Sequence, residues 1–102
     1  MIAKKFLKSK PVCKATFSLP TEAVQGAKKV TLVGDFNNWD TESGIKMKKS
    51  KDVFKTTVDL ETGKEYEFRY LLDGETWEND WAADKYVATP FGVENSVVST
   101  LN

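Results

Sequence analysis

The sequence of 102 residues contains no histidine, and this absence excludes several kinds of chemistry. Without an imidazole the chain lacks the usual general base, the Ser-His-Asp and Cys-His arrangements for nucleophilic catalysis, and the commonest metal ligand. Its one cysteine, Cys13, can form neither an internal disulfide nor a four-cysteine zinc site, and a free thiol fits a reducing, cytoplasmic location. No run approaches the roughly 18 apolar residues of a membrane-spanning helix. We therefore expect no cofactor, no metal and no membrane partner.

An excess of one charge is also missing, because 15 basic side chains balance 15 acidic ones. The balance hides an asymmetry: residues 1–55 carry 12 basic and 5 acidic side chains, whereas residues 56–102 carry 3 and 10. A separate basic body would suggest nucleic-acid binding. A chain of this length is one domain's worth, so the two halves must share a core and their fields largely cancel.

The strongest argument for a nucleic-acid partner is a group of lysines around one predicted turn: Lys46, Lys48, Lys49, Lys51 and Lys55. Recognition of phosphates and bases favours arginine, however, and the chain has a single one. Lysines beside a hairpin also commonly protect a sheet edge from pairing. We therefore predict no nucleic-acid partner.

Carboxylate pairs are the remaining catalytic candidates, because glycoside hydrolysis needs only two acidic groups. Asp80 with Asp84, or Asp35 with Asp40, provides such a pair in the sequence. Acidic residues in turns more often cap and solvate the backbone, and no calcium-binding loop pattern surrounds them. We predict that the chain is not an enzyme.

Short runs that alternate between apolar and polar residues predict an all-β fold. The clearest strands are expected at 12–19, 29–34, 53–60, 65–72 and 96–101, with shorter candidates at 45–48 and 86–88. In the run 65–72 the aromatic side chains point to one side and Arg69 to the other. Turn signals such as Asp73-Gly74 separate the runs, and no convincing helix is present. Residues 1–10 are expected to be a basic, flexible lead-in to one domain at 11–102.

Three tryptophans lie in polar turn contexts: Trp39, Trp77 and Trp81. An exposed tryptophan forgoes several kcal/mol, because its roughly 150–250 Å² of surface is worth about 25 cal/mol/Å² when buried. These rings either plug the ends of a sandwich or form a flat apolar platform. A platform suits the C–H face of a sugar, while Asn and Arg donors suit its hydroxyl rim.

The segment 30–39, VTLVGDFNNW, resembles the signature of family-48 carbohydrate-binding modules. This family includes the glycogen-binding domain of the AMP-activated protein kinase β subunit and the N-terminal early-set domains of isoamylases and branching enzymes. The resemblance continues through YEFRYLLDG at 66–74, ND at 79–80, YV at 86–87 and PFGVENSVV at 90–98, and it covers about residues 12–101.

The resemblance implies an immunoglobulin-like, early-set β-sandwich of about seven antiparallel strands that binds α-1,4-linked glucans such as glycogen, starch or maltooligosaccharides. In the family pattern Trp39 and Trp77 match the stacking tryptophans, and Asn95 matches a residue that bonds glucose hydroxyls. Arg69 stands where the kinase-type domains have a sugar-contacting lysine, and Phe91 stands where they place an apolar residue against the sugar.

Two departures from the family pattern leave alternatives open. The turn before Trp77 is one residue longer than in the kinase-type domains, and Trp81 stands where the family usually has proline. Trp81 therefore either adds a third aromatic surface or fills a gap. Some early-set domains have lost sugar binding, so the alternative function is an interaction module that docks on a glycoside hydrolase or another glycogen-metabolising protein. Retention of both stacking tryptophans and Asn95 argues for sugar binding.

Overall fold

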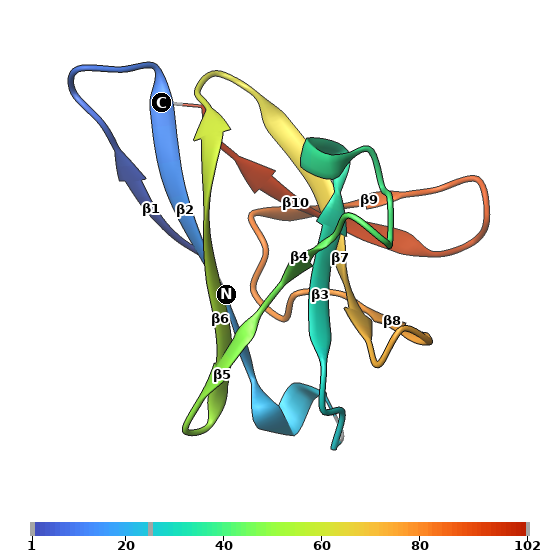
Figure 1. The fold of residues 1–102 in the computed structure, drawn as a ribbon. Coiled ribbons are helices and arrows are strands. Elements are labelled where there is room, and N and C mark those ends of the chain that lie inside the picture. Colours follow the sequence, from blue (N-terminus) through green and yellow to red (C-terminus); the bar gives the residue numbers. More distant parts are fainter. Residues whose placement is uncertain (1, 25, 102) are drawn as a thin grey trace.

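The computed structural model describes residues 2–24 and 26–101, which form two antiparallel sheets packed face to face (Figure 1). One sheet has four strands in the order β1-β2-β6-β5, and the other has the order β4-β3-β7-β10-β9 with β8 added to β7. The strands are β1 (Ile2–Phe6), β2 (Val12–Pro20), β3 (Val30–Gly34), β4 (Ile45–Lys46), β5 (Lys48–Ser50), β6 (Val53–Glu61), β7 (Glu65–Leu72), β8 (Thr76–Glu78), β9 (Lys85–Ala88) and β10 (Glu94–Ser99). Two single-turn 3₁₀ helices, η1 (Thr21–Ala23) and η2 (Asp35–Asn37), follow β2 and β3.

The all-β sandwich predicted from the alternating runs is confirmed, and each predicted strand is present with ends that move by a few residues. The described residues contain ten strands rather than about seven. The additional ones are β1, β5 and β8, which lie at sheet edges or beside a hairpin turn. Short edge strands carry few alternating residues, so their sequence signal is weak.

The prediction that residues 1–10 form a flexible lead-in is wrong for Ile2–Phe6, which pair with β2 as strand β1. The register places Ile2 opposite Phe17, so the first strand adds an apolar side chain to the core. Lys4 reaches across to Asp84 with an Nζ–Oδ2 distance of 2.6 Å. The ion pair joins residues that are 80 positions apart, so the local sequence does not reveal it.

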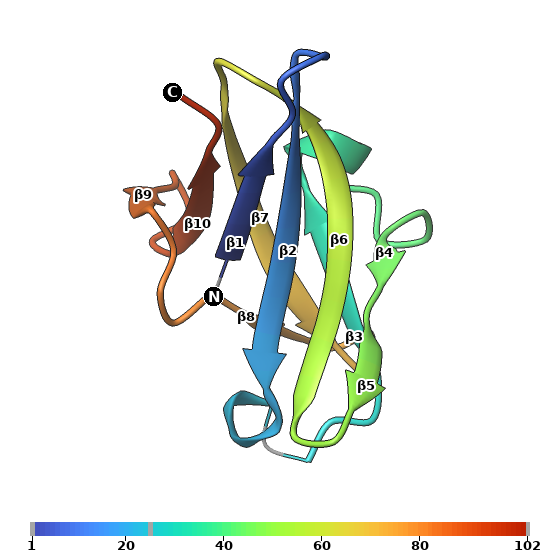
Figure 2. The same ribbon diagram turned by 90° about the vertical axis from the view of Figure 1, so that its left-hand side faces the viewer.

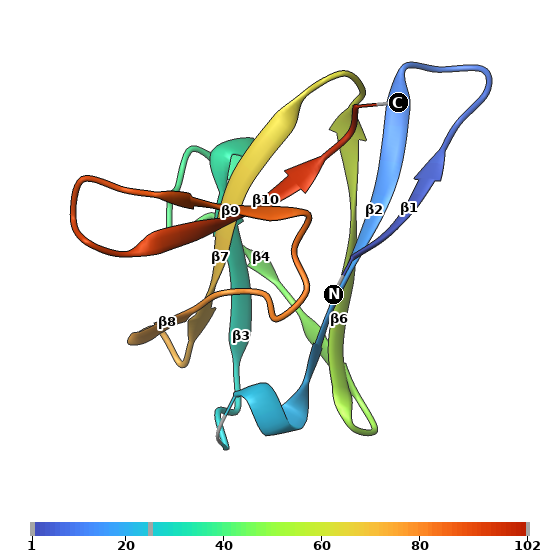
Figure 3. The same ribbon diagram turned by 180° about the vertical axis from the view of Figure 1, so that it is seen from behind.

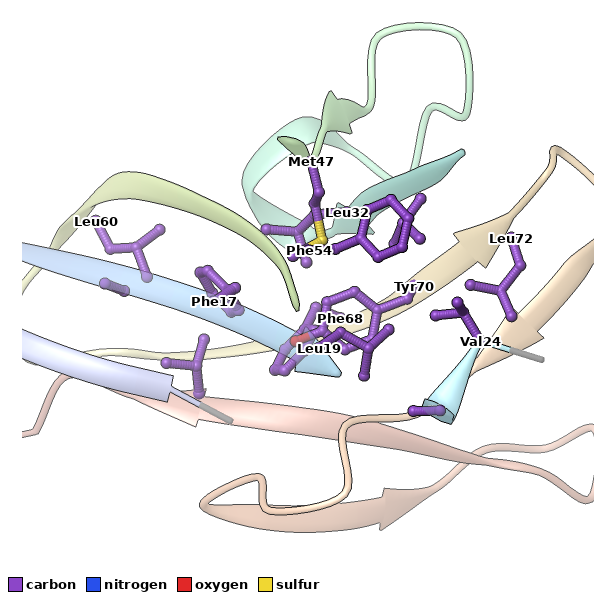
Figure 4. Close-up of a cluster of buried hydrophobic side chains, with 14 residues drawn as sticks. Phe17, Leu19, Val24, Leu32, Met47, Phe54, Leu60, Phe68, Tyr70 and Leu72 are labelled. Atoms are coloured by element: carbon purple, nitrogen blue, oxygen red, sulfur yellow. The ribbon is translucent and has the colours of Figure 1, made fainter. Parts of the chain in front are cut away.

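The core lies between the two sheets and is built from side chains at alternate positions of β2, β6 and β7 (Figure 4). The ring of Phe17 meets the ring of Phe68 edge-on, with centroids 5.1 Å apart, and Phe68 meets Tyr70 in the same way at 5.6 Å. The inward side of β7 therefore holds the aromatic residues, as the alternation predicts. The outward side of β7 is left to Glu67, Arg69 and Leu71.

Strands β9 and β10 extend the six-stranded sheet to one side of the area that the four-stranded sheet covers (Figures 2 and 3). The β9–β10 turn and the β8 hairpin both project to the side away from β1 and β2 (Figure 3). The helix η2 lies beside β7 at the end of β3. These three elements, together with the outward side of β7, surround the site described below.

Candidate functional site

The first part of the site is the turn at residues 34–39, where the sequence of the motif determines the backbone. Gly34 lies so close to β7 that a Cβ atom there would be 2.5 Å from the carbonyl oxygen of Glu67, so only glycine is accommodated. The side chain of Asn37 accepts a hydrogen bond from the Gly34 N–H at 3.0 Å. Asn38 and Trp39 both have φ values of 57°, in the left-handed region that is uncommon for a bulky residue. The motif thus forces the chain to present Trp39 outward.

Asp35 holds Trp39 in this position. The indole Nε1–H of Trp39 donates to Asp35 Oδ1 at 2.8 Å, and the backbone N–H of Glu67 donates to Asp35 Oδ2 at 2.7 Å. One carboxylate therefore ties the Trp39 ring to the backbone of β7. A half-buried tryptophan ring restrained in this way is ordered before any ligand arrives, which lowers the entropy cost of binding.

Arg69 lies between two indole rings on the outward side of β7. Its Cζ atom is 5.8 Å from the ring centroid of Trp39 and 5.1 Å from that of Trp77, distances typical of cation–π contacts. The two rings are 6.4 Å apart and tilted by 55° to each other. Trp77 reaches this position because β8 pairs with β7 and sets it opposite Leu71. The arrangement joins two aromatic faces and one cation in a single surface.

The other wall of the site is the β9–β10 hairpin. Phe91 stands at its tip and is 88% exposed, while the Thr89 N–H closes the turn by donating to the carbonyl oxygen of Val93 at 2.8 Å. Asn95 lies on β10 beside β7 and is only 8% exposed. Between this hairpin and Trp39 is a shallow pocket of about 380 Å³. Its lining residues are Trp39, Glu67, Arg69, Ala88, Thr89, Pro90, Phe91 and Asn95.

Two of the pocket residues carry buried polar atoms without a hydrogen-bond partner among the described residues: Arg69 Nε and Asn95 Oδ1. Buried polar atoms in folded proteins are nearly always bonded, so each exception needs an explanation. Asn95 uses its other amide atom, since Nδ2 donates to Glu67 Oε1 at 3.0 Å. Both unpartnered atoms belong to side chains that can bind a polar ligand in this pocket.

The structure brings together the five residues predicted from the sequence. Trp39, Arg69, Phe91 and Asn95 line the pocket, and Trp77 adjoins it through its contacts with Arg69 and Trp39. Sequence reasoning missed Asp35 and Glu67 as members of the site. Strand alternation offered a signal for Glu67, because it lies two residues before Arg69 and therefore on the same side of β7.

Trp81 does not line this pocket. It follows Asp80, whose backbone N–H donates to Ser96 Oγ at 2.9 Å and whose carboxylate accepts from the Tyr70 hydroxyl at 2.6 Å. Ser96 and Tyr70 point to the inward side of the sheet, whereas Asn95 lies on the outward side. The segment that carries Trp81 is thus attached to the opposite side of the sheet from the pocket. With 56% of its surface exposed, Trp81 does not fill a gap in the core.

The carboxylates considered as catalytic pairs all have structural contacts. Asp84 pairs with Lys4 and accepts from the Ser99 N–H, and Asp35 bonds Trp39 as described. A hydrogen bond from the backbone N–H of Glu42 lowers the pKa of Asp40. Within residues 2–24 and 26–101 no three acidic, cysteine or histidine side chains gather where they could hold a metal ion. No helix in the described part of the chain is long and apolar enough to cross a membrane.

A β-sandwich that presents tryptophan rings beside amide and guanidinium groups has the character of a carbohydrate-binding module. The comparison with known families agrees with this class. The family described as the glycogen recognition site of AMP-activated protein kinase matches residues 21–100, and the chain belongs to that family. Its members are modules that recognise carbohydrate, and the resemblance predicted from the motifs is confirmed.

Individual relatives are AMP-activated protein kinase β subunits. The chain is 33% identical over 73 residues to 5′-AMP-activated protein kinase subunit beta-1 of Sus scrofa, which covers 72% of this chain and 55% of that protein. It is 32% identical over 74 residues to subunit beta-2 of Mus musculus and of Homo sapiens, covering 72% of this chain and 26% and 25% of those proteins. The chain therefore spans between a quarter and about half of the relatives that it matches.

Proposed function

We propose that the chain binds α-1,4-linked glucans of the glycogen or starch type and that it does so without catalysing a reaction on them. The observation that supports this most is the convergence of five residues on one surface. Trp39 comes from the turn at 34–39, Arg69 from β7, Trp77 from β8, and both Phe91 and Asn95 from the β9–β10 hairpin. All five surround or adjoin the same shallow pocket. Residues 11–102 would then form the binding domain, with β1 as an additional edge strand.

The chemistry of a glucose unit matches this surface. One face of the ring carries mainly C–H groups, which pack well on the indoles of Trp39 and Trp77. The hydroxyl rim needs hydrogen-bonding groups, and Arg69 and Asn95 supply them with two buried atoms that lack a protein partner. Phe91 extends the apolar wall on the far side of the pocket. A neutral ligand of this kind also requires no strong field from the protein.

The expected affinity is modest. Two or three stacking contacts of about 1 kcal/mol each, with a few hydrogen bonds of similar net value, total about −4 to −6 kcal/mol. This corresponds to a Kd from about 1 mM to tens of micromolar. A shallow surface site of this strength suits a polymer that offers many equivalent binding positions.

Native gel electrophoresis with glycogen or amylopectin in the gel tests the proposal. We expect the wild-type chain to be retarded and the Trp39→Ala variant to migrate nearly as it does without polysaccharide. Trp81→Ala is the matched control, because it removes the most exposed tryptophan on the opposite side of the sheet. Migration of the wild-type chain that is the same with and without polysaccharide would contradict glucan binding.

The same family resemblance also leads to predictions of a protein partner and of a cellular location. The relatives are named as subunits of a protein kinase. We propose that this chain likewise works beside another protein of glycogen metabolism in the cytoplasm. An isolated chain that binds maltoheptaose without any added protein would separate glucan binding from this second role.

A further inference from the structure

We infer that Glu67 is a positioning residue of the site: it fixes the side-chain amide of Asn95 so that Oδ1 serves as a hydrogen-bond acceptor for the ligand. The inference rests on the proposed glucan-binding function, which it deepens. The family pattern supplies Asn95 as a residue that bonds hydroxyls. The structure adds which of its two amide atoms is free to do so.

The contact between the two side chains determines the orientation of the amide. Asn95 Nδ2 lies 3.0 Å from Glu67 Oε1, and a carboxylate can only accept hydrogen bonds. If the amide were turned over, two oxygen atoms would face each other at this distance. Glu67 therefore selects the orientation in which Nδ2 is used inside the protein and Oδ1 is left over.

Asn95 Oδ1 is also the atom for which the described residues provide no hydrogen-bond partner. Asn95 is buried, because only 8% of its surface is exposed, and Oδ1 is covered without a hydrogen bond. Asn95 also lines the pocket together with Phe91, which is 88% exposed at the tip of its turn and is held by little packing. A small movement of this wall would open Oδ1 to a ligand hydroxyl, and the new bond would satisfy a buried acceptor.

The position of Glu67 is itself determined by the rest of the site. Its backbone N–H donates to Asp35 Oδ2 at 2.7 Å, and Asp35 Oδ1 accepts from the indole of Trp39 at 2.8 Å. A line of three hydrogen bonds thus runs from the stacking ring to the amide of Asn95. The ring and the acceptor are held at a fixed separation, so they can contact the same sugar unit or neighbouring ones without further ordering.

An exchange of donor and acceptor across this contact tests the inference. Asn95→Asp places a carboxylate against Glu67, and we expect repulsion to weaken maltoheptaose binding about tenfold or more. Adding Glu67→Gln restores a donor opposite the carboxylate introduced by the first substitution. Because aspartate retains an acceptor for the ligand, the double variant should bind within about threefold of the wild type. Calorimetry with maltoheptaose measures all three proteins, and thermal melting checks that each is folded.

A double variant as weak as Asn95→Asp alone would overturn the inference, since Asn95 would then act toward the ligand as a donor. The free protein supplies a test that does not depend on glucan binding. In ¹⁵N–¹H spectra the side-chain amide protons of Asn95 should shift in Glu67→Ala but stay near their wild-type positions in Glu67→Gln. Identical Asn95 amide signals in wild type and Glu67→Ala would also overturn it. Failure of the wild-type chain to bind maltoheptaose would instead count against the proposed function.

Discussion

The indole N–H of Trp39 donates a 2.8 Å hydrogen bond to the carboxylate of Asp35, four residues earlier in the chain. This short contact closes a turn in which Trp39 itself has a left-handed backbone conformation with φ of 57°. A bulky residue adopts that conformation only where the surroundings determine it. The free-energy cost of this backbone conformation is consistent with a Trp39 ring that is held in one orientation. Asp35 supports that orientation although it does not line the pocket.

Replacing Asp35 by Ala should therefore weaken glucan binding although the pocket residues are unchanged. The variant loses the acceptor for both Trp39 and the Glu67 backbone N–H, and we expect a stability loss of about 1–3 kcal/mol with a fall in affinity of about tenfold. Asp40→Ala is the control, because Asp40 lies in the same region and its carboxylate accepts a hydrogen bond from the Glu42 N–H within its own turn. Calorimetry with maltoheptaose measures the effect, and equal affinities for the two variants would contradict the role of Asp35.

Arg69→Lys keeps the charge and removes the planar guanidinium, so it tests whether geometry matters at this position. Arg69 Nε is buried, and the Cζ atom lies 5.1 Å from the Trp77 ring centroid. Lysine has a single rotatable donor group and stacks less well on indole. We expect a loss of affinity of about three- to tenfold, by analogy with cation–π and hydrogen-bond contributions of about 1 kcal/mol. Binding of Arg69→Lys at the wild-type affinity would show that only the charge is required.

Gly34→Ala should destabilise the fold, because the new Cβ would lie 2.5 Å from the Glu67 carbonyl oxygen and 2.7 Å from Phe68 Cβ. Neither neighbour can move without separating β3 from β7, and we expect a loss of more than about 2 kcal/mol. Gly63→Ala is the matched control: Gly63 has φ of 78° with open space around it, so its cost should be about 1 kcal/mol. Urea denaturation compares the two, and equal midpoints would contradict the close approach of the strands.

Tyr70→Phe tests the polar contact beneath the β8–β9 segment. The Tyr70 hydroxyl donates to Asp80 at 2.6 Å, and burial beside that carboxylate raises the pKa of Tyr70. Removal of the donor should cost about 1–3 kcal/mol. Tyr66→Phe removes a hydroxyl bonded to the Glu61 carbonyl oxygen at 2.9 Å in an exposed position and should cost less. Chemical denaturation of both variants measures the difference, and equal losses would contradict the importance of burial.

Much of the fold could be predicted because alternation within β2, β6 and β7 is a local pattern with a local cause. Strand β1 could not, because Lys4 and Lys5 look like a basic tail until pairing with β2 and the contact with Asp84 are known. The ion pair between Lys4 and Asp84 joins residues that are 80 positions apart in the chain. Sequence patterning over a few residues carries no such information.

The candidate site, like the fold, could be predicted from the sequence only in part. Trp39 and Trp77 could be assigned through the family motif. Both rings contact Arg69 because its side chain lies on the outward side of β7. Local sequence did not separate Trp77 from Trp81, since both follow polar turns. The difference arises from the buried contacts of Asp80, which attach Trp81 to the inward side of the sheet. Glu67 could not be assigned to the site from the sequence, because a glutamate at an outward strand position has the same pattern as any solvent-exposed residue.

The most direct test of glucan binding at this site is a ¹⁵N–¹H titration that follows the three indole N–H signals of the wild-type chain as maltoheptaose is added. We predict saturable shifts of the Trp39 and Trp77 signals with one common Kd, and a Trp81 signal that stays in place. Saturable shifts of Trp81 with unmoved Trp39 and Trp77 signals would contradict the proposed site, because the glucan would then bind on the other side of the sheet.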